Sequence, residues 1–417
     1  MSRSGHSVTS VSRRGFLRAV GTAAAATAAG FSSASRGQPG PNERIGVGLI
    51  GCGGRMQAHI DVLLGLKAEG RPLDIVAVQD VYKPRVDTAV ERTGGKPYRD
   101  HRELLADPAV DVVGIASPDR HHGPQAIDAV LAGKDVYSEK PLTHWTQFEV
   151  VKRLTHLAEE RGAVVQVGTQ RLADSIWRQA RQLVDEGAIG KPIQVQLGYF
   201  RQGDWGERGM PILDPNAKPG PDLDWEAFLG DAPKRDFDVS RFFRWRMYLD
   251  YAGGPPTDLY PHVLAPIAVA AGLGLPTRVS AAGGKLFYNS EREVPDTVNI
   301  LADYPQGVSV AVLGTQVNAR DIETCIRGSE ATMCFAGAGI QLFPAGGGDM
   351  IREVAREQGG DARELWVNLL ECVRTREKPW SDVRTQYGVQ TTMNMAMLSL
   401  LQGKTAHFDA EREEIRL

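Results

Sequence analysis

A short glycine-rich segment, Gly51-Cys52-Gly53-Gly54, follows a predominantly apolar run at residues 44–50. The apolar run predicts a buried parallel strand, and residues 57–66 after the glycines predict a helix. Glycines between a strand and a helix let the backbone turn sharply and approach a neighbouring group closely. This arrangement is typical of the first unit of a doubly wound α/β domain.

Further apolar runs alternate with helical segments up to residue 168. Such alternation predicts an N-terminal Rossmann domain at residues 44–168, a parallel sheet with helices on both faces. The strands are expected at 73–78, 110–116, 135–138 and 163–167, with helices at 124–132 and 145–160.

The pattern changes in the rest of the chain, which we assign to a second domain at residues 169–417. Apolar and polar residues alternate at 193–197, 298–302 and 308–312, as in antiparallel strands with one face in water. Two helical segments, at 362–374 and 387–401, close the chain. The expected fold class is therefore α/β followed by α+β.

The glycine segment predicts a binding site for a dinucleotide. The helix that follows offers unpaired N–H groups to the pyrophosphate, although Met56 stands where a third glycine or alanine is commonest. Asp80 would accept hydrogen bonds from the adenosine ribose and repel a 2′-phosphate, so NAD is favoured over NADP. The expected cofactor contacts here are Gly51, Gly53, Gly54, Arg55, Met56 and Asp80.

A leader is predicted at residues 1–34, followed by a linker at 35–43. The run Ser12-Arg13-Arg14-Gly15-Phe16-Leu17-Arg18, with apolar residues at 19–31 and small residues at 32–34, is typical of a twin-arginine signal. A membrane anchor is disfavoured, because the apolar stretch is shorter than the roughly 18 residues that span a bilayer. We expect export to the periplasm by the twin-arginine machinery, without a stable membrane anchor.

Export would constrain the cofactor, because dissolved NAD is a cytoplasmic pool. The protein is expected to fold around its dinucleotide before crossing the membrane. A hydride taken from a substrate would then be returned within the same protein.

Charge and cysteine content disfavour several other classes. The formal charge is −3, and removal of residues 1–34 takes away four arginines and no acidic residue, which leaves −7. An acidic surface disfavours nucleic acid and anionic lipid. The four cysteines lack zinc-ligand spacing; Cys325 and Cys334 are expected as two separately buried thiols, although an oxidising compartment would permit a bridge.

Three motifs follow the glycine segment: Ser117-Pro118-Asp119-Arg120-His121-His122, Glu139-Lys140-Pro141 and Gly253-Gly254-x-x-x-Asp258-x-x-x-His262. In this order they resemble the Gfo/Idh/MocA family, which includes glucose–fructose oxidoreductase and inositol dehydrogenase. The resemblance covers essentially the whole chain after the leader. It implies a nicotinamide cofactor, a large open C-terminal sheet that often serves as a homo-oligomer interface, and action at a hydroxyl-bearing carbon of a sugar or related compound.

The resemblance also implies roles for single residues. Lys140 would orient the substrate hydroxyl and stabilise the developing alkoxide, and His262, oriented through Asp258, would act as the acid or base. Tyr260 could assist. No metal site is expected, because neighbouring histidine side chains diverge and no third ligand is evident. Further cofactor contacts would come from Ser117, Pro118, His122, Glu139 and Lys140.

Residues 199–260 hold 12 of the 29 aromatic residues and predict a binding region whose rings could stack on a sugar. A hydrophobic lid or a subunit contact is the alternative. Arginines such as Arg201 and Arg246 also admit an acidic sugar. The expected substrate contacts are Tyr260, Arg171 and Trp245.

Three functions remain open from the sequence. The favoured one is an exported oxidoreductase with retained NAD(H) that acts on a sugar or glycoside. The second is a redox-neutral glycoside hydrolase, in which transient oxidation allows the aglycone to leave. A non-catalytic sugar-binding protein is the least favoured, because Lys140, Asp258 and His262 are all present.

Overall fold

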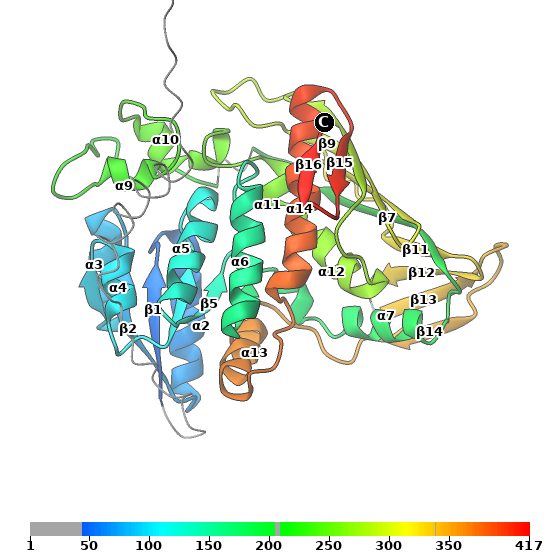
Figure 1. Ribbon diagram of the computed structural model, residues 1–417, viewed down its shortest axis with the longest axis horizontal. Coiled ribbons are helices and arrows are strands. Elements are labelled where there is room, and N and C mark those ends of the chain that lie inside the picture. Colours follow the sequence, from blue (N-terminus) through cyan, green and yellow to red (C-terminus); the bar gives the residue numbers. More distant parts are fainter. Residues whose placement is uncertain (1–43, 205–208, 338) are drawn as a thin grey trace, which may run out of the picture. The chain divides into compact units, whose positions relative to one another are not determined.

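Two sheets, one of six strands and one of ten, form the framework of the protein (Figure 1). The computed structural model describes residues 44–204, 209–337 and 339–417. The predicted leader at 1–34 and the linker at 35–43 therefore lie outside the described residues. Within the described ranges, no helix is long and apolar enough to cross a membrane.

The six-stranded sheet is parallel throughout, in the order β3-β2-β1-β4-β5-β6, and confirms the predicted Rossmann fold. The strand order reverses between β1 and β4, and sheets of this type bind ligands at the carboxyl ends of their strands near such a reversal. The strands are β1 (Ile45–Ile50), β2 (Leu73–Gln79), β3 (Lys96–Tyr98), β4 (Val112–Ile115), β5 (Asp135–Ser138) and β6 (Val165–Val167). The helices are α2 (Gly54–Ala68), α3 (Lys83–Thr93), α4 (His101–Ala106), α5 (Asp119–Leu131) and α6 (Phe148–Arg161).

The ten-stranded sheet is antiparallel apart from the parallel pair β7 and β10, which confirms the predicted second fold class. Its order is β14-β13-β12-β11-β7-β10-β9-β8-β15-β16. The strands are β7 (Pro192–Phe200), β8 (Arg278–Gly284), β9 (Thr297–Tyr304), β10 (Val308–Thr315), β11 (Cys325–Gly328), β12 (Ala331–Ala336), β13 (Gly339–Pro344), β14 (Arg352–Ala355), β15 (Ala406–Asp409) and β16 (Glu414–Arg416).

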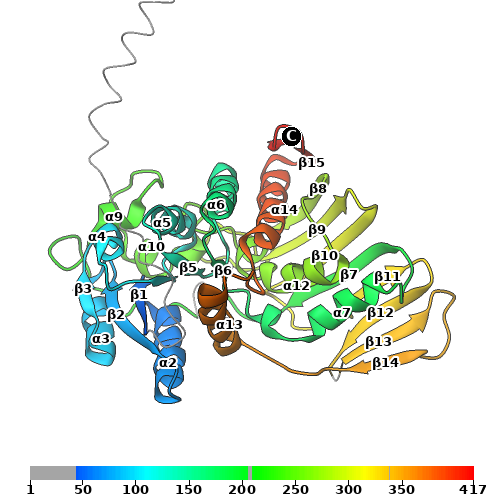
Figure 2. The same cartoon turned by 60° about the horizontal axis from the view of Figure 1, so that its bottom comes forward.

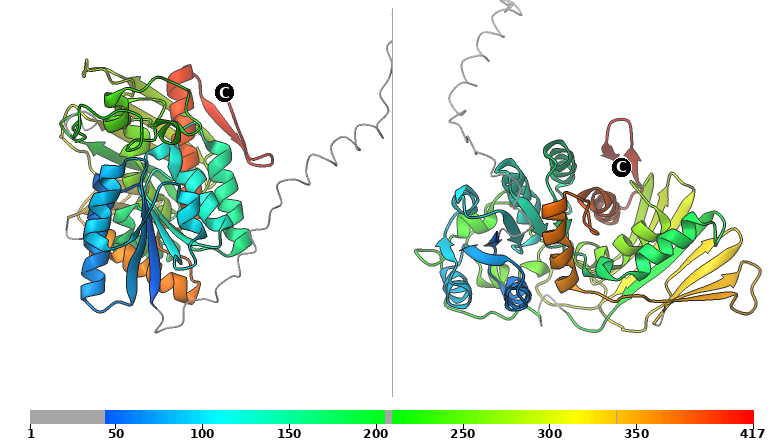
Figure 3. Two further views of the ribbon diagram at one scale, coloured as in Figure 1. Left: turned by 90° about the vertical axis from the view of Figure 1, so that its left-hand side faces the viewer. Right: turned by 90° about the horizontal axis from the view of Figure 1, so that it is seen from below.

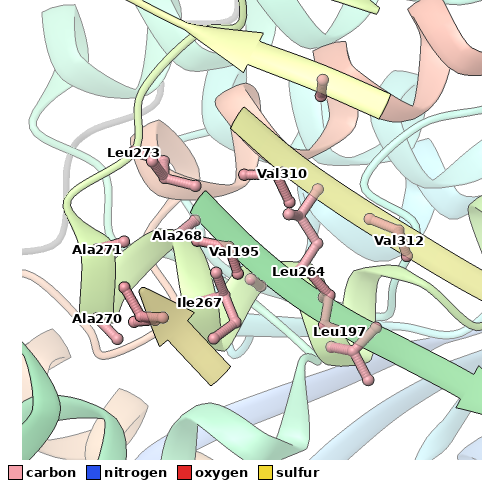
Figure 4. Close-up of a cluster of buried hydrophobic side chains, with 14 of the residues drawn as sticks. Val195, Leu197, Leu264, Ile267, Ala268, Ala270, Ala271, Leu273, Val310 and Val312 are labelled. Carbon is pink, nitrogen blue, oxygen red and sulfur yellow. The ribbon is translucent and has the colours of Figure 1, made fainter. Parts of the chain in front are cut away.

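Helices α7 (Ile176–Asp185), α12 (Pro261–Ala271) and α14 (Val383–Gln402) lie along one face of this sheet (Figure 2). Leu264 and Ile267 of α12 pack with Val195 and Val310 of the sheet (Figure 4). Along β10 the side chains alternate between buried and half-buried, as expected for a strand with one covered face. This packing fixes the N-terminal end of α12, where two of the predicted site residues lie.

Helix α13 (Ala362–Thr375) returns to the Rossmann domain and packs beside α2 (Figure 2). Trp366 on α13 stacks on Tyr137 of β5, with ring centroids 4.5 Å apart. Both rings are fully buried, in the same apolar cluster as Leu49 of β1. The core of the first domain therefore includes a segment from near the end of the chain.

The segment 201–254, which we call the insert, contains α9 (Trp225–Leu229) and α10 (Val239–Phe243). It lies over the end of the Rossmann domain near α3 and α5 (Figures 1 and 3). Its buried aromatic side chains form one cluster, which also includes Tyr82 of the Rossmann domain. Most rings of this region therefore pack against one another, which differs from the predicted surface of rings free to stack on a sugar and is closer to the alternative of a hydrophobic lid.

Cys325 and Cys334 are both buried free thiols, as predicted, and they are neighbours. They lie directly opposite each other in the antiparallel pair β11 and β12. The N–H of Phe335 donates to the carbonyl of Thr324, so the neighbouring pair is the hydrogen-bonded one. The cysteines therefore occupy a non-hydrogen-bonded position, in which opposing side chains come closest.

Candidate functional site

The glycine segment has the geometry that a pyrophosphate requires. Gly51 has φ +82°, and a Cβ there would lie 2.6 Å from the backbone nitrogen of Ser117. Gly53 caps α2 without a side chain, so the first N–H groups of the helix face outward uncovered. Gly54 has open space where its Cβ would stand. These residues fit the phosphates of a dinucleotide, as predicted.

Asp80 ends the second strand beside this loop. Its two carboxylate oxygens accept hydrogen bonds from the N–H groups of Cys52, at 2.7 Å, and Tyr82, at 2.9 Å. Burial raises the pKa of Asp80, and the guanidinium of Arg85, 4.0 Å away, opposes that shift. The carboxylate is thus fixed where an adenosine ribose would lie.

A groove of about 120 Å³ connects these residues. It runs past Ser117 and Pro118, as predicted for cofactor contacts, and Arg55 lines it too. The side chain of Met56 instead packs fully buried in the apolar core with Ile60 and Leu63. The side chain of Met56, a predicted cofactor contact, therefore does not line the groove, because it lies on the inner face of α2.

Glu139 lies at the end of β5 as the acceptor of three side chains. One oxygen receives hydrogen bonds from Arg55 at 2.8 Å, His59 at 2.9 Å and Gln170 at 3.0 Å. The indole N–H of Trp366 donates to Nδ1 of His59, so Nε2 of that ring carries the proton given to Glu139. Arg55 and His59 hold the pKa of Glu139 well below its usual range despite complete burial.

Lys140 points into a second cavity, of about 240 Å³, which we call the pocket. Its ammonium donates to the Asp258 carboxylate at 2.8 Å and to the Asp258 carbonyl at 2.6 Å. Nε of Arg246 lies 3.3 Å from the same carboxylate oxygen. Lys140 and Arg246 hold the pKa of Asp258 far below its ordinary value.

His262 lines the pocket from the first turn of α12, together with Lys140 and Asp258. Burial and the charge of Lys140 lower the pKa of His262 to about 3, so the imidazole is neutral. Among the described residues no hydrogen bond joins Asp258 to His262, although the charge of the Asp258 carboxylate acts to raise the pKa of His262. The carboxylate of Asp258 instead forms ion pairs with Lys140 and Arg246.

Three residues were predicted as substrate contacts, but none of them lines the pocket: Tyr260, Trp245 and Arg171. Tyr260 is fully buried, and its hydroxyl donates to the carbonyl of Val298 in the sheet. Trp245 lines the dinucleotide groove instead. Arg171 is exposed and lies 5.9 Å from the ring of Tyr199, which does line the pocket.

His122 lines the pocket while bridging two strand ends. Its ring nitrogens lie 2.7 Å from the carbonyl oxygens of Ser117 and Pro141. Burial lowers the pKa of His122 to about 4. The neutral ring has one N–H and donates to only one of these two carbonyls, and it lies between the segments that follow β4 and β5.

The sequence places Arg246 in the predicted binding region and Asp119 in a motif, but it does not predict the contacts of either residue. Arg246 lines both the groove and the pocket. Asp119, the first residue of α5, is 1 % exposed, and neither carboxylate oxygen has a hydrogen-bond partner. Burial raises the pKa of Asp119 to about 7, against the opposing effect of Arg246. In the described residues, no three potential metal ligands form a cluster.

Several known proteins are similar to this chain. One family model, an oxidoreductase family with an NAD-binding Rossmann fold, matches residues 45–169. A second, the C-terminal alpha/beta domain of an oxidoreductase family, matches residues 174–416. Inositol 2-dehydrogenase of Rubrobacter xylanophilus is 30% identical over 205 residues, which are 49% of this chain and 53% of that protein.

A second relative, scyllo-inositol 2-dehydrogenase (NAD(+)) of Bacillus subtilis, is 31% identical over 40% of this chain and 45% of its own length. The chain thus spans about half the length of the curated relatives it matches. Among solved structures, the WlbA dehydrogenase of Bordetella pertussis, in complex with NADH and UDP-GlcNAcA, is similar with a TM-score of 0.66. That match covers 88% of this chain and 99% of the other at 20% identity, so it supports the fold.

The family models together cover the groove, the pocket and both sheets. The glycine loop, Asp80 and the uncapped helix N-terminus fit the NAD that the first model describes. The chain belongs to the Gfo/Idh/MocA family of oxidoreductases, with an NAD-binding Rossmann domain.

Proposed function

We propose that this protein is an exported dehydrogenase that retains NAD(H) and oxidises a hydroxyl-bearing carbon of a sugar-like compound. The observation that carries the proposal is the insert, which lies across the dinucleotide groove. Met210, Phe228 and Trp245 of the insert line the groove opposite the glycine loop. A dinucleotide bound there would be covered by protein on both sides.

Several contacts fasten the insert to the Rossmann domain. The N–H of Asp224 donates to the carbonyl of Val81, and the N–H of Lys83 donates to the carbonyl of Asp222. The hydroxyl of Tyr82 donates to Asp214 at 2.9 Å. Release of the cofactor would require these bonds to break together, which supports slow exchange with the solvent.

Further contacts fasten the insert on the side of α5. Arg120 donates to the carbonyl of Asp250 and forms an ion pair with Asp231 at 3.2 Å. His144 and Trp145 both contact the carbonyl of Leu249. The insert is thus held at two separate edges of the groove.

The residues of the pocket can divide the work of alcohol oxidation. NAD accepts the hydride when it is bound. Lys140 would donate a hydrogen bond to the hydroxyl and stabilise the alkoxide as the proton leaves. The imidazole of His262 is neutral at ordinary pH, so a ring nitrogen is available to accept that proton, and its lowered pKa makes it a weak base. Asp258 keeps Lys140 in place.

The names of relatives favour oxidation of ring hydroxyls. Two relatives are inositol dehydrogenases, and the WlbA structure contains a nucleotide sugar acid. No observation favours net hydrolysis of a glycoside, although the same residues would begin that reaction. The twin-arginine signal and the periplasmic location remain part of the proposal.

The test is to express the full chain in a twin-arginine-competent host and purify it from the periplasm without added dinucleotide. We expect cleavage of residues 1–34, about one NAD(H) released per denatured protein, and interconversion of a hydroxy sugar and a keto sugar acceptor without added NAD. Protein that is empty, or that needs NAD for each turnover, would contradict retention. Release of an aglycone from aryl glycosides would instead favour the hydrolytic reaction.

A further inference from the structure

Arg246 is held rigidly between the groove and the pocket. Its guanidinium lies 4.2 Å from the ring centroid of Trp245, Nε contacts Asp258 and Nη1 lies 3.2 Å from the sulfur of Met210. Among the described residues, Nη2 has no hydrogen-bond partner. A guanidinium fixed on one edge and open on the other can bind a planar anion in a bidentate manner.

The pocket around this guanidinium is rich in positive charge. Four cationic side chains line it, and the lining carboxylates are Glu139 and Asp258. Glu139 is already matched by Arg55, His59 and Gln170, and Asp258 by Lys140 and Arg246. The cationic residues are Arg55, Lys140, Arg201 and Arg246.

The pocket offers little surface for stacking on a neutral sugar. Besides the imidazoles of His122 and His262, Tyr199 supplies the one aromatic ring among its described lining residues. The rings of the insert, including Phe228, Phe242 and Tyr251, are buried against one another. Charge and hydrogen bonds, rather than ring stacking, are therefore what the pocket provides for recognition.

We propose that Arg246 binds a carboxylate of the substrate, and that the protein selects polyhydroxylated acids such as uronates over neutral sugars. The reacting hydroxyl would lie at Lys140, and the acid group would meet the free edge of Arg246. This inference rests on the proposed function, because it places the substrate in the same pocket. It goes further by assigning the substrate class and the residue that selects it.

The cofactor is the other possible source of an anion, because Arg246 also lines the groove. The pyrophosphate, however, has its own site at the N-terminus of α2. Arg246 contacts Asp258, the partner of Lys140, and so lies with the residues of the reacting alcohol. These contacts favour the substrate as the source of the anion.

The test measures binding to the NAD-loaded protein by calorimetry, so that it does not depend on turnover. Glucuronate, galacturonate and mannuronate are each compared with the parent hexose and with the neutral uronamide. We expect at least one uronate to bind about 10- to 100-fold more tightly than both neutral partners, as a charge-assisted pair allows. Arg246→Gln should remove this preference, and Arg246→Lys should restore part of it.

Arg235→Gln is the matched control, because Arg235 lies in the insert but pairs with Asp250 outside both cavities. It should keep the full preference. Equal binding of uronates and neutral partners, or a preference that survives in Arg246→Gln, would overturn the inference. Loss of NAD from Arg246→Gln with the uronate preference intact would also overturn it and assign Arg246 to the pyrophosphate.

The two proposals fail in different ways. Uronate binding through Arg246 without any oxidation would leave this inference standing and contradict the proposed dehydrogenase. Oxidation of neutral sugars by a protein that binds no uronate would do the reverse.

Discussion

The ammonium of Lys140 lies 2.8 Å from the carboxylate of Asp258, and both side chains are only 11% exposed. Removal of one partner of a buried pair leaves the other charge uncompensated, which typically costs about 3–5 kcal/mol. We expect Asp258→Asn to lower the free energy of unfolding by about 3 kcal/mol and to reduce activity, because Lys140 and Arg246 would then face each other.

Denaturant unfolding of the Asp258→Asn protein measures the first effect, and initial rates measure the second. The double variant Lys140→Met with Asp258→Leu is the control. It should recover part of the lost stability without activity, because Arg246 still lacks its carboxylate partner. Full activity in Asp258→Asn would show that the pair does not position Lys140.

His262 provides the second prediction. Replacement by Asn should lower kcat about 100- to 10,000-fold, the usual contribution of a general acid or base. The NAD content should stay unchanged, because His262 lines the pocket and not the groove. Since its pKa is lowered to about 3, wild-type activity should show no loss from protonation of His262 between pH 5 and 8. A fall in the wild-type rate between pH 8 and 5 that is absent in His262→Asn would contradict this assignment.

Asp119 gives a prediction about stability and pH. Burial raises its pKa in the folded protein to about 7 from an ordinary value of 3.8, so the folded state binds the proton more tightly. Stability contributed by protonation is complete below about pH 4 and is lost as pH rises through 7. Asp119→Asn should therefore raise Tm relative to wild type at pH 8 by more than at pH 4. Parallel Tm curves for the two proteins would contradict the buried, unpaired carboxylate.

The insert should control the retention of NAD. Arg120→Gln removes the ion pair with Asp231 and weakens the bond to the carbonyl of Asp250. We expect NAD to be lost at least 10-fold faster during gel filtration, with the fold intact by circular dichroism. Arg235→Gln, which breaks an ion pair with Asp250 within the insert, should lose NAD at the wild-type rate. Equal rates for both variants would mean that the insert does not hold the cofactor.

Cys325 and Cys334 should form a disulfide when equilibrated with oxidised glutathione. A non-hydrogen-bonded pair brings Cα atoms to about 4.5 Å, within the range that a disulfide spans. Burial raises the pKa of both thiols, that of Cys334 to about 12, so the reaction should take hours at neutral pH. Non-reducing peptide mapping would detect the bond, with Cys325→Ser as the control. Free thiols at equilibrium would contradict the prediction.

The sequence indicated the parts of the fold that follow from local patterns. Long apolar runs identified β1, β2, β4, β5 and β6, whereas the short edge strand Lys96–Tyr98 carries no apolar run and was not indicated. The packing of α13 on the first sheet also escaped prediction. It depends on the contact between Trp366 and Tyr137, which lie far apart in the sequence, and no local sequence pattern predicts such a contact.

In the site, too, the sequence predicted the positions that follow from local patterns and did not predict the long-range contacts. Glycines, Asp80 and Lys140 lie at strand ends, where sequence position determines location, and the structure brings them to the groove and the pocket. The spacing of Asp258 and His262 placed both in the pocket, but it could not show that Asp258 turns to Lys140. Arg246 lies in a short 3-10 helix, Trp245–Met247, within the insert, and its contact with Asp258 depends on tertiary packing.

The stacking of Trp366 on Tyr137 means that the Rossmann domain cannot complete its core until synthesis of the chain is nearly finished. The Rossmann domain is translated first, but helix α13, which covers part of its core, leaves the ribosome only near the end of synthesis. A fragment cut after residue 168 would expose Tyr137 and the neighbouring apolar side chains to water. The two halves are therefore unsuited to separate expression or to exchange as modules between relatives.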